Sequence, residues 1–497
     1  MSLYKDQIHE YVQCHRKEIV EELKELLAIP SARGEAIVGA PFGQGPAAAL
    51  RYSRQLYEKH GFATELDAEG GYLLSYYSKD GLGDADEQAK KSLGLFAHAD
   101  TVDPGKDWIY TEPFIPLEKD GFLICRGSLD NKAAVVLSLY CAKLLRELSL
   151  PFSNRLVMFT GSSEETGMQD IQNYVARHTT PDFSLVCDTG FPFYRGNKGI
   201  MNIQVSSKRV LRGIKDFSGG KAVNVTVGRG RVRLNFDEKL YAALKKKEIE
   251  RIKVFVEAQE NTKESENMEK HSSAEVREIV ILTEGISSHG ALPEGSLNAG
   301  YLAAQFLAEC ELICESDRTV LSYAAEMLKN YYGEALHIEN KDPEFGRLTC
   351  TNGIIRMVEG KLELTFNIRF GKDISADTIK DTCRALLEKK DWDMKVERET
   401  LPWIIGLENP YVRALLEVYR KFTGEENAEP KVNAGGTYAK YLPCAIETGP
   451  QLWKRIPFYM PAGHGGVHQP DECLSVDGFL ESIELTTEML LECDKVL

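Results

Sequence analysis

The sequence has no apolar run long enough to cross a membrane. Its longest nearly apolar stretch, residues 133–145, is shorter than the roughly 18 residues that a membrane-spanning helix requires. The sequence also lacks a net positive charge, because 75 acidic residues outnumber 60 basic residues and leave a formal charge of −15. We therefore expect neither nucleic acids nor membranes as partners.

Signals for disulfides, export and nucleotide binding are also missing. The 11 cysteines are scattered, odd in number and mostly surrounded by apolar residues, which is typical of reduced thiols in a core. The first residues, MSLYKDQIHEYV, are polar and do not have the pattern of a signal peptide, so we expect a cytoplasmic protein. Residues 227–233, VGRGRVR, lack the Gly-rich turn into a helix that a nucleotide site needs.

The sequence does contain acidic and histidine residues at the ends of apolar segments. In residues 93–100, LGLFAHAD, a buried-strand pattern runs directly into His98 and Asp100. Side chains two positions apart on a strand point the same way, and a metal-ligating histidine usually donates its second ring N–H to a carboxylate. We interpret His98 as a metal ligand and Asp100 as its orienting partner. A surface ion pair is the simpler alternative.

Two further segments carry carboxylates at such ends. Asp130 stands between an apolar strand expected at 122–125 and a helix expected at 132–148, where it could bind a ligand or only cap the helix. Glu164 and Glu165 follow the apolar strand RLVMFTG. Because adjacent side chains diverge, one glutamate could bind a metal while the other acts as a general base. Two solvated glutamates at a helix start are the alternative.

The last two segments complete the set. Asp188 ends the apolar strand in FSLVCDTGFP, and the late loop GHGGVHQPDE offers both His464 and His468. We prefer His468 as the ligand, because HQPDE is the stretch that fits the family pattern described below. Five candidates at equivalent strand or loop ends are difficult to explain as coincidental caps.

The chemistry of these candidates is coherent. Two imidazoles and three carboxylates suit two divalent ions with one bridging carboxylate, and the proposed ligands are His98, Asp130, Glu165, Asp188 and His468. Two dications bring four positive charges and three carboxylates remove three, so the remaining charge would favour a hydroxide nucleophile near neutral pH. Asp130 is the expected bridge. Glu164 would take the proton of the water and deliver it to the leaving amine.

Taken in order, seven motifs resemble a known superfamily: HAD, RGSLDNK, SSEETG, CDTGFP, SSHGALPEGSLNAG, GGTYAK and GVHQPDE. The resemblance is to the di-metal aminopeptidases, carboxypeptidases and aminoacylases, and within them to the PepV-type and carnosinase-like dipeptidases. It extends from about Glu22 to the C-terminus. The ordered set is highly specific, although each motif alone is not.

The resemblance implies a role for each metal-site residue. His98, Asp130 and Asp188 match the ligands of one ion, whereas Asp130, Glu165 and His468 match those of the other. It also implies that the residue in the position of Glu164 is the general base and that Asp100 supports the first histidine. Asn131 is a departure, because many relatives carry a second acidic residue there.

The resemblance also implies residues that contact the substrate. His289 matches a lid histidine that stabilises the oxyanion, while Arg369 and Asn224 match lid positions that hold the terminal carboxylate and backbone of the substrate. Gly435, Gly436 and Thr437 match a glycine-rich segment of the family. The backbone amides of that segment contact the same end of the substrate. Each of the three lid residues also has a simpler interpretation. His289 could be an ordinary loop histidine, Arg369 a strand arginine that faces solvent, and Asn224 an asparagine that stabilises a turn.

The fold class follows from how the elements alternate. Residues 1–197 are expected to form the first part of an α/β catalytic domain, with a mostly parallel sheet covered by helices, and residues 402–497 its second part. Residues 198–401 mix short alternating strands with amphipathic helices at 238–252 and 298–311, which predicts an inserted α+β lid domain. The charged tract 260–278 is expected to be exposed.

The resemblance further implies that the long lid contains a duplicated half that imitates a partner, which would make the protein a monomer. The predicted function is hydrolysis of the amide bond of dipeptides with free termini, with two divalent ions as cofactors. Zinc is the expected ion, and manganese and cobalt are alternatives. An N-acyl amino acid deacylase or desuccinylase would use the same site. A non-catalytic metal-binding protein on this scaffold is a more distant alternative, since none of the six metal and base residues is missing.

Overall fold

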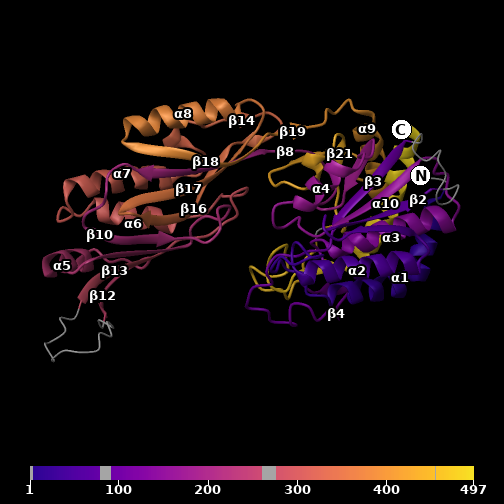
Figure 1. Ribbon diagram of the computed structural model, residues 1–497, viewed down its shortest axis with the longest axis horizontal. Helices are drawn as coiled ribbons and strands as arrows, with labels where there is room; N and C mark the ends of the chain where they lie inside the picture. The colour runs from indigo at the N-terminus through magenta and orange to yellow at the C-terminus, as the bar shows by residue number, and fades with distance from the viewer. Residues whose placement is uncertain (1–3, 79–90, 260–275, 454) are drawn as a thin grey trace. The chain divides into compact units, whose positions relative to one another are not determined.

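The computed structural model describes residues 4–78, 91–259, 276–453 and 455–497 (Figure 1). Most of the charged tract expected to be exposed, residues 260–275, lies outside these ranges. The chain divides into two compact units. The first unit comprises Met1–Asn197 and Ile404–Leu497, and the second comprises Lys198–Trp403, so the second unit ends at Trp403 rather than at residue 401.

A mixed sheet forms the centre of the first unit. Among the described residues it has nine strands in the order β1-β2-β6-β3-β7-β21-β8-β19, with β20 beside β8. The middle strands β6, β3, β7 and β21 run parallel, and β2 pairs antiparallel with β6. The strands are β1 (Ala63–Asp67), β2 (Tyr72–Tyr77), β3 (Ser92–His98), β6 (Arg155–Gly161), β7 (Phe183–Val186), β8 (Tyr194–Asn197), β19 (Trp403–Ile404), β20 (Lys431–Asn433) and β21 (Ala445–Glu447).

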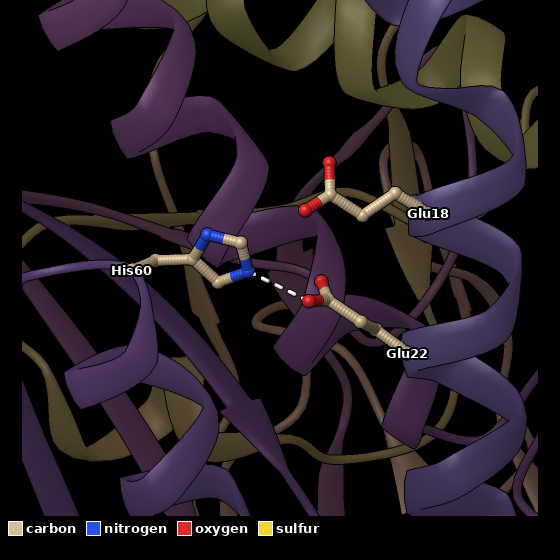
Figure 2. A group of neighbouring side chains, drawn as sticks. All are labelled: Glu18, Glu22 and His60. Carbon is tan, nitrogen blue, oxygen red and sulfur yellow. Dashed lines mark hydrogen bonds and ion pairs between the residues drawn. The ribbon is translucent and has the colours of Figure 1, made fainter.

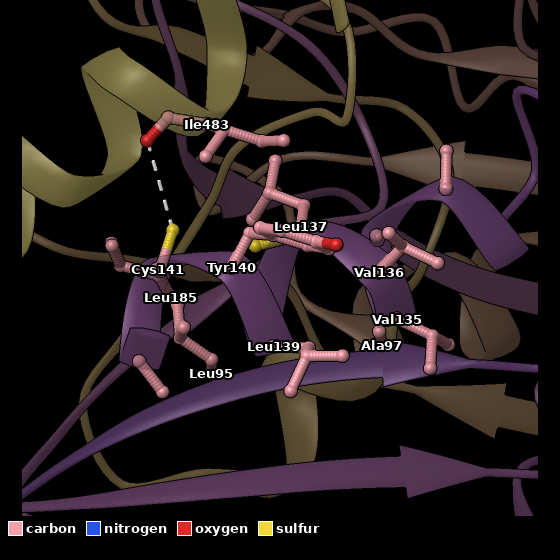
Figure 3. Close-up of a cluster of buried hydrophobic side chains, with 14 of the residues drawn as sticks. Leu95, Ala97, Val135, Val136, Leu137, Leu139, Tyr140, Cys141, Leu185 and Ile483 are labelled. Atoms are coloured by element: carbon pink, nitrogen blue, oxygen red, sulfur yellow. Dashed lines mark hydrogen bonds between the residues drawn. The ribbon is translucent and has the colours of Figure 1, made fainter. Parts of the chain in front are cut away.

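Helix α3 (Lys132–Glu147) lies at the heart of this unit. Its sequence, KAAVVLSLYCAKLLRE, is apolar on nearly every side, and residues 132–145 are all buried. Figure 3 shows its leucine and valine side chains packed against Leu95 and Ala97 of β3 and toward Ile483 of α10 (Val476–Val496). Each fully buried leucine or valine side chain contributes about 1.5–3 kcal/mol. The remaining helices are α1 (Lys5–Leu27), α2 (Gln44–Lys59), α4 (Gln169–Arg177), α9 (Pro410–Thr423) and the short η3 (Tyr438–Tyr441).

The strand expected at 122–125 is not part of the main sheet. Strand β5 (Phe122–Ile124) instead pairs with β4 (Leu117–Lys119) and with β22 (Cys473–Ser475), forming a separate antiparallel sheet of three strands. The predicted strand is therefore present, but it belongs to a different sheet from the strands that precede Asp188 and carry His98. Pattern alone does not reveal the partner of a short apolar strand, and here the partner comes from the far end of the chain.

The second unit contains one antiparallel sheet of eight strands, within the described part of the chain. Its order is β12-β13-β11-β10-β16-β17-β9-β18, and side chains alternate along β9, where Met201, Ile203 and Val205 are buried. The strands are β9 (Gly199–Ser207), β10 (Ile214–Gly219), β11 (Arg229–Asn235), β12 (Ile252–Gln259), β13 (Val276–Glu284), β16 (Thr349–Val358), β17 (Lys361–Phe370) and β18 (Trp392–Thr400), with a small hairpin of β14 (Lys341–Asp342) and β15 (Gly346–Arg347).

The helices of the second unit are shorter than expected. Helix α5 (Glu238–Lys246) ends well before residue 252, because residues from Ile252 onward pair with β13 instead. Helix α6 (Ala299–Ala308) packs on β11 and β13 and against α7 (Glu315–Lys329). Helix α8 (Ala376–Lys389) packs on β18. Residues Glu334–Leu336 form a 3₁₀ turn, η2. The pairing of β10 with β16 joins two four-stranded halves of the sheet.

Two predictions made from what the sequence lacks can be compared with the structure. All 11 cysteines are unpaired, and eight of them are buried, as expected of core thiols. Across the residues that are described, no helix combines the length and the apolar character needed to cross a membrane.

A polar cluster joins α1, α2 and α3 in the first unit (Figure 2). Glu22 is 3% exposed, and its Oε1 accepts hydrogen bonds from Lys59 Nζ at 2.8 Å and from the His60 ring at 2.7 Å. Its Oε2 accepts a hydrogen bond from the Tyr140 hydroxyl at 2.7 Å. Glu18 also belongs to this cluster. Glu18, Glu22 and His60 are possible metal ligands, because their candidate ligand atoms lie within 4.8 Å of one another.

We assign this cluster a structural role, because lysines already balance its negative charge. Lys59 contacts Glu22, and Lys143 lies 3.7 Å from Glu18. Although burial alone would raise the pKa of Glu22, the hydrogen bonds from His60, Lys59 and Tyr140 lower it to about 2. The ionised carboxylate therefore stabilises the folded state above pH 4.5, and this stabilisation is lost as the pH falls from about 4.5 to about 2.

We predict that Glu22→Gln lowers the free energy of unfolding by about 2 kcal/mol at pH 7, since it weakens three hydrogen bonds to a buried charge. The difference from wild type should shrink as the pH falls below 4.5. Urea titrations at several pH values would measure it. The control is Glu21→Gln on the same helix, where an exposed pair with Lys24 contributes little. An equal effect of both variants would contradict the assignment.

Candidate metal centre

Five of the residues expected to bind metal lie in two groups that share one member. The first group is His98, Asp130 and Asp188, and the second is Asp130, Glu165 and His468; within each, the candidate ligand atoms lie within 4.8 Å of one another. His98 ends β3, Asp188 follows β7, and Glu165 follows β6. Because these three strands are parallel neighbours, their carboxyl ends meet at one edge of the sheet.

The ring of His98 is fully buried and aimed at carboxylates. Its Nδ1 lies 3.1 Å from the Asp100 carbonyl oxygen and 3.3 Å from Asp100 Oδ1. Its Nε2 lies 3.1 Å from Asp130 Oδ1 and 3.4 Å from Asp188 Oδ1, yet it makes no hydrogen bond to any described residue. A buried ring nitrogen facing two carboxylate oxygens without a hydrogen bond fits a shared cation.

Asp130 lies between the two histidines. Its Oδ1 faces His98, whereas its Oδ2 lies 3.0 Å from His468 Nε2. That same nitrogen lies 3.1 Å from Glu165 Oε1. The side chain of His468 is 51% exposed, so the second group opens toward solvent while the first is enclosed. A carboxylate with one oxygen in each group is suited to bridge two ions.

Glu164 and Glu165 are held by Asp100. The backbone N–H of Glu164 donates to Asp100 Oδ1 and that of Glu165 donates to Asp100 Oδ2, both at 3.2 Å. Asp100 therefore contacts the His98 ring through its carbonyl and Oδ1, and it also fixes the turn that carries both glutamates. The side chain of Glu164 belongs to neither ligand group within the described residues, and the residue is 8% exposed.

The site holds more negative charge than its own residues balance. Burial and the charge of Asp188 raise the pKa of Glu164 well above its ordinary value. Burial and the charge of Asp130 raise the pKa of Glu165 to about 7. Burial disfavours the charged form of His98, but Asp188 and the other carboxylates raise its pKa well above the usual value. Bound cations would relieve this repulsion.

His464, the competing histidine, is engaged elsewhere. Its Nδ1 lies 2.7 Å from Asp471 Oδ2, and Asp471 also accepts hydrogen bonds from the backbone of Ile109 and Tyr110. His464 therefore helps to join two loops. His468 is the histidine of this segment that lies with Asp130 and Glu165.

Pattern reasoning on single residues missed Glu472, which supports the loop of Asp130. Both Glu472 and Arg126 are almost completely buried, and Arg126 Nη1 donates to Glu472 Oε2 at 2.5 Å. Glu472 Oε1 accepts the backbone N–H groups of Leu129 at 2.8 Å and of Asp130 at 2.9 Å. Asn131 adds a further support, because its side chain donates to the Cys187 carbonyl at 2.7 Å.

Asp170 is a second residue that pattern reasoning missed. It accepts the backbone N–H groups of Ser162 at 2.6 Å and of Ser163 at 2.7 Å, and the hydroxyl of Tyr438 at 2.5 Å. Gly161 permits this approach, since a Cβ atom there would lie 2.0 Å from the Tyr438 hydroxyl. Asp170 therefore links the turn that carries the two glutamates to the segment after Gly435–Thr437. No local pattern marks it, because its partner Tyr438 is remote in sequence.

The second unit contains three of the six residues expected to contact substrate, Asn224, His289 and Arg369. Asn224 Nδ2 lies 3.4 Å from His289 Nε2, and Gly290 N–H donates to the Asn224 carbonyl at 2.8 Å. Arg369 Nε donates to Asn367 Oδ1 at 2.9 Å, and a Cβ atom on Gly290 would lie 3.3 Å from that same oxygen. Arg369 is buried rather than facing solvent, and burial and Arg398 lower its pKa to about 10.

Comparison with known proteins identifies the family. One family profile matches residues 94–492, a segment that contains both ligand groups. The chain belongs to peptidase family M20/M25/M40. The protein is therefore a peptidase, and the family resemblance inferred from its motifs is confirmed.

Relatives of this M20 peptidase match over nearly its whole length. A Bacillus subtilis (strain 168) protein named "Putative dipeptidase YtjP" is 27% identical over 488 residues, which cover 97% of this chain and 98% of that protein. A Staphylococcus epidermidis (strain ATCC 12228 / FDA PCI 1200) protein of the same description is 24% identical over 458 residues, which cover 90% of this chain and 92% of that protein.

Solved structures of low sequence identity share the fold. Human carnosine dipeptidase 1 aligns with a TM-score of 0.57 at 14% identity, covering 99% of both chains. The Saccharomyces cerevisiae di-peptidase Dug1p aligns with a TM-score of 0.54 at 12% identity, covering 100% of this chain and 99% of that chain. The predicted fold class, an α/β domain with a mostly parallel sheet and an α+β insertion, is confirmed.

We predict that Glu472→Gln lowers the affinity of this M20 peptidase for divalent metal by roughly 10- to 100-fold, because an amide cannot accept hydrogen bonds on both of its terminal atoms. Titration of the metal-free enzyme with Zn²⁺ against a competing chelator would measure this. Glu484→Gln is the matched control, since Glu484 is also buried and pairs with the more exposed His9. Wild-type affinity in folded Glu472→Gln would contradict the assigned role.

Proposed function

We propose that this M20 peptidase hydrolyses the amide bond of dipeptides with free termini. The observation that carries the proposal is the pair of ligand groups that share Asp130, with Glu164 beside them and in neither group. The names of the relatives support the choice of dipeptides, because both the sequence relatives and two structural neighbours are described as dipeptidases.

Two divalent cations would be held by the shared-aspartate groups, with His98, Asp130 and Asp188 around one and Asp130, Glu165 and His468 around the other. When bound, they would supply Lewis acidity that polarises the amide carbonyl and lowers the pKa of water. We propose zinc as the ion, since imidazole and carboxylate ligands suit it, and manganese and cobalt bind the same ligand types.

The residues of the chain would then handle the proton. The carboxylate of Glu164 accepts a proton as the attacking water forms a C–O bond to the amide carbon, and it then delivers the proton to the nitrogen of the leaving amine as the C–N bond breaks. Asp100 keeps Glu164 in place through the backbone and orients the His98 ring. These roles require a carboxylate at Glu164 that is not occupied as a ligand.

We also propose substrate-binding roles for residues outside the metal groups. His289 would stabilise the oxyanion, and Arg369 and Asn224 would hold the carboxylate and backbone of the substrate. The backbone amides of Gly435 and Gly436, with Thr437, would receive the same end of the substrate. The contact between Asn224 and His289 supports their acting together, and Arg369 is held by Asn367.

We predict that Glu164→Gln retains both ions but lowers kcat by roughly 1,000-fold, because an amide cannot accept the proton. Glu165→Gln should instead reduce the bound metal, which makes it a contrasting variant on the adjacent residue. Elemental analysis of the dialysed proteins and steady-state kinetics would separate the two outcomes. Near-normal turnover by Glu164→Gln would remove Glu164 from the proposed role.

We predict that the metal-loaded enzyme cleaves dipeptides at least 100-fold more efficiently than N-acetyl or N-succinyl amino acids, because its sequence relatives are described as dipeptidases. The measurement is kcat/KM over matched panels, after removal of metal by chelation and its replacement with Zn²⁺, Mn²⁺ or Co²⁺. Turnover of only the N-acyl substrates would replace the dipeptidase proposal with a deacylase or desuccinylase.

A further inference from the structure

A buried glutamate outside the metal groups contacts the glycine segment proposed to bind substrate. Glu447 is the last residue of β21, it is 0% exposed, and β21 runs parallel to β7, the strand that precedes Asp188. None of the motifs that identify the family includes Glu447. A buried carboxylate is costly unless hydrogen bonds compensate it, so its partners indicate what it stabilises.

All three side-chain donors to Glu447 come from the same neighbourhood. Thr437 Oγ1 donates to Oε1 at 2.6 Å, and Asn197 Nδ2 donates to Oε1 at 2.8 Å. Asn433 Nδ2 donates to Oε2 at 3.1 Å, while its Oδ1 accepts the backbone N–H of Gly435 at 2.8 Å. Glu447 therefore holds both ends of the segment 433–437. It also positions the Gly435 amide indirectly, because the Asn433 side chain that donates to Glu447 accepts the Gly435 N–H.

The other side of this segment is tied to the metal centre. Tyr438, which follows Thr437, donates to Asp170, and its ring centroid lies 6.3 Å from that of His98 in an edge-on arrangement. The glycine amides thus lie in a short loop fixed by Glu447 at Asn433 and Thr437 and by Asp170 at Tyr438. Two glycines would otherwise leave this loop with a large choice of backbone conformations.

We propose that Glu447 is a positioning residue that fixes residues 433–437 for binding of the carboxylate at the free C-terminus of the substrate. This inference rests on the proposed function, which assigns the backbone amides of Gly435 and Gly436 to that end of the substrate. Glu447 acts through Asn433 and Thr437 and does not itself touch the reacting atoms. It would thereby contribute to selectivity for substrates with a free carboxylate over amidated ones.

The arrangement requires a carboxylate rather than an amide at this position. Oε1 accepts two hydrogen bonds and Oε2 accepts one, whereas a glutamine offers one accepting oxygen and one donating nitrogen. In Glu447→Gln at least one neighbouring donor would face another donor. Thr437→Val tests the same contact from the other side, since it removes the donor to Glu447, together with the acceptor of the Ala439 N–H, and introduces no new charge.

The first experiment measures the segment without any substrate. Hydrogen–deuterium exchange of the full-length, metal-loaded enzyme should show at least tenfold faster exchange of amides in residues 433–438 in Glu447→Gln, with a smaller increase in Thr437→Val. Glu488→Gln is the matched control, because Glu488 is also buried but lies within α10. Unchanged exchange at 433–438 in both test variants would overturn the proposal whatever the substrate is.

The second experiment measures selectivity. With a dipeptide that the wild type cleaves, Glu447→Gln should raise KM roughly fivefold to tenfold and change kcat less than about threefold, which is the loss expected from one or two hydrogen bonds. With the C-terminal amide of that dipeptide, KM should be unaffected. Thr437→Val should act in the same direction, and the double variant should show less than the sum of the two effects.

The outcomes separate this proposal from the proposed function. If the wild type cleaves no dipeptide, the proposed function fails, and the exchange experiment still decides whether Glu447 positions the segment. If exchange rises in the variants but the preference for a free carboxylate over the amide is unchanged, the carboxylate-positioning role is overturned. Equal losses on both substrates in Glu447→Gln and Glu488→Gln would indicate a general structural effect and also overturn it.

Discussion

Two buried carboxylates outside the ligand groups, those of Asp100 and Glu472, hold the backbone segments that carry the carboxylates of the metal centre. Asp100 accepts the amides of Glu164 and Glu165, and Glu472 accepts those of Leu129 and Asp130. A carboxylate that is anchored through the chain keeps its direction even when neighbouring charges push against it. The protein thus builds a strongly negative site before a cation is bound, and the attraction of that site for cations is a direct consequence.

The fold supplies the rigid frame on which these contacts depend. Three parallel strands bring His98, Asp188 and the glutamate turn to one edge, and α3, buried along almost its whole length, begins directly after the loop of Asp130. The supporting carboxylates are themselves buried and fully engaged. A small displacement of one of these supporting carboxylates would also move the backbone of a residue in the metal centre. Residues that are not metal ligands therefore contribute to the geometry of that centre.

Much of this could be predicted from the sequence, because strand-end residues of an α/β sheet are recognisable from local patterns. The metal-site candidates from His98 to His468 stood out by residue type and position. The small sheet of β4, β5 and β22, the early end of α5, and the buried state of Arg369 could not be predicted, since each depends on partners that are distant in sequence. The supporting roles of Glu472, Asp170 and Glu447 were also missed, because each has at least one partner that is distant in sequence.

The sequence by itself determined the family of this protein, its class as a peptidase and the α/β class of its main sheet. Residue types, their order and hydrophobic periodicity are local properties that can be read without coordinates. Only the tertiary structure decided that Asp130 faces both histidines, that His464 is engaged by Asp471, and that a glutamate on β21 holds the glycine segment. These are contacts between side chains, some of them as far apart in sequence as Asp130 and His468, and the packing of the chain sets their distances.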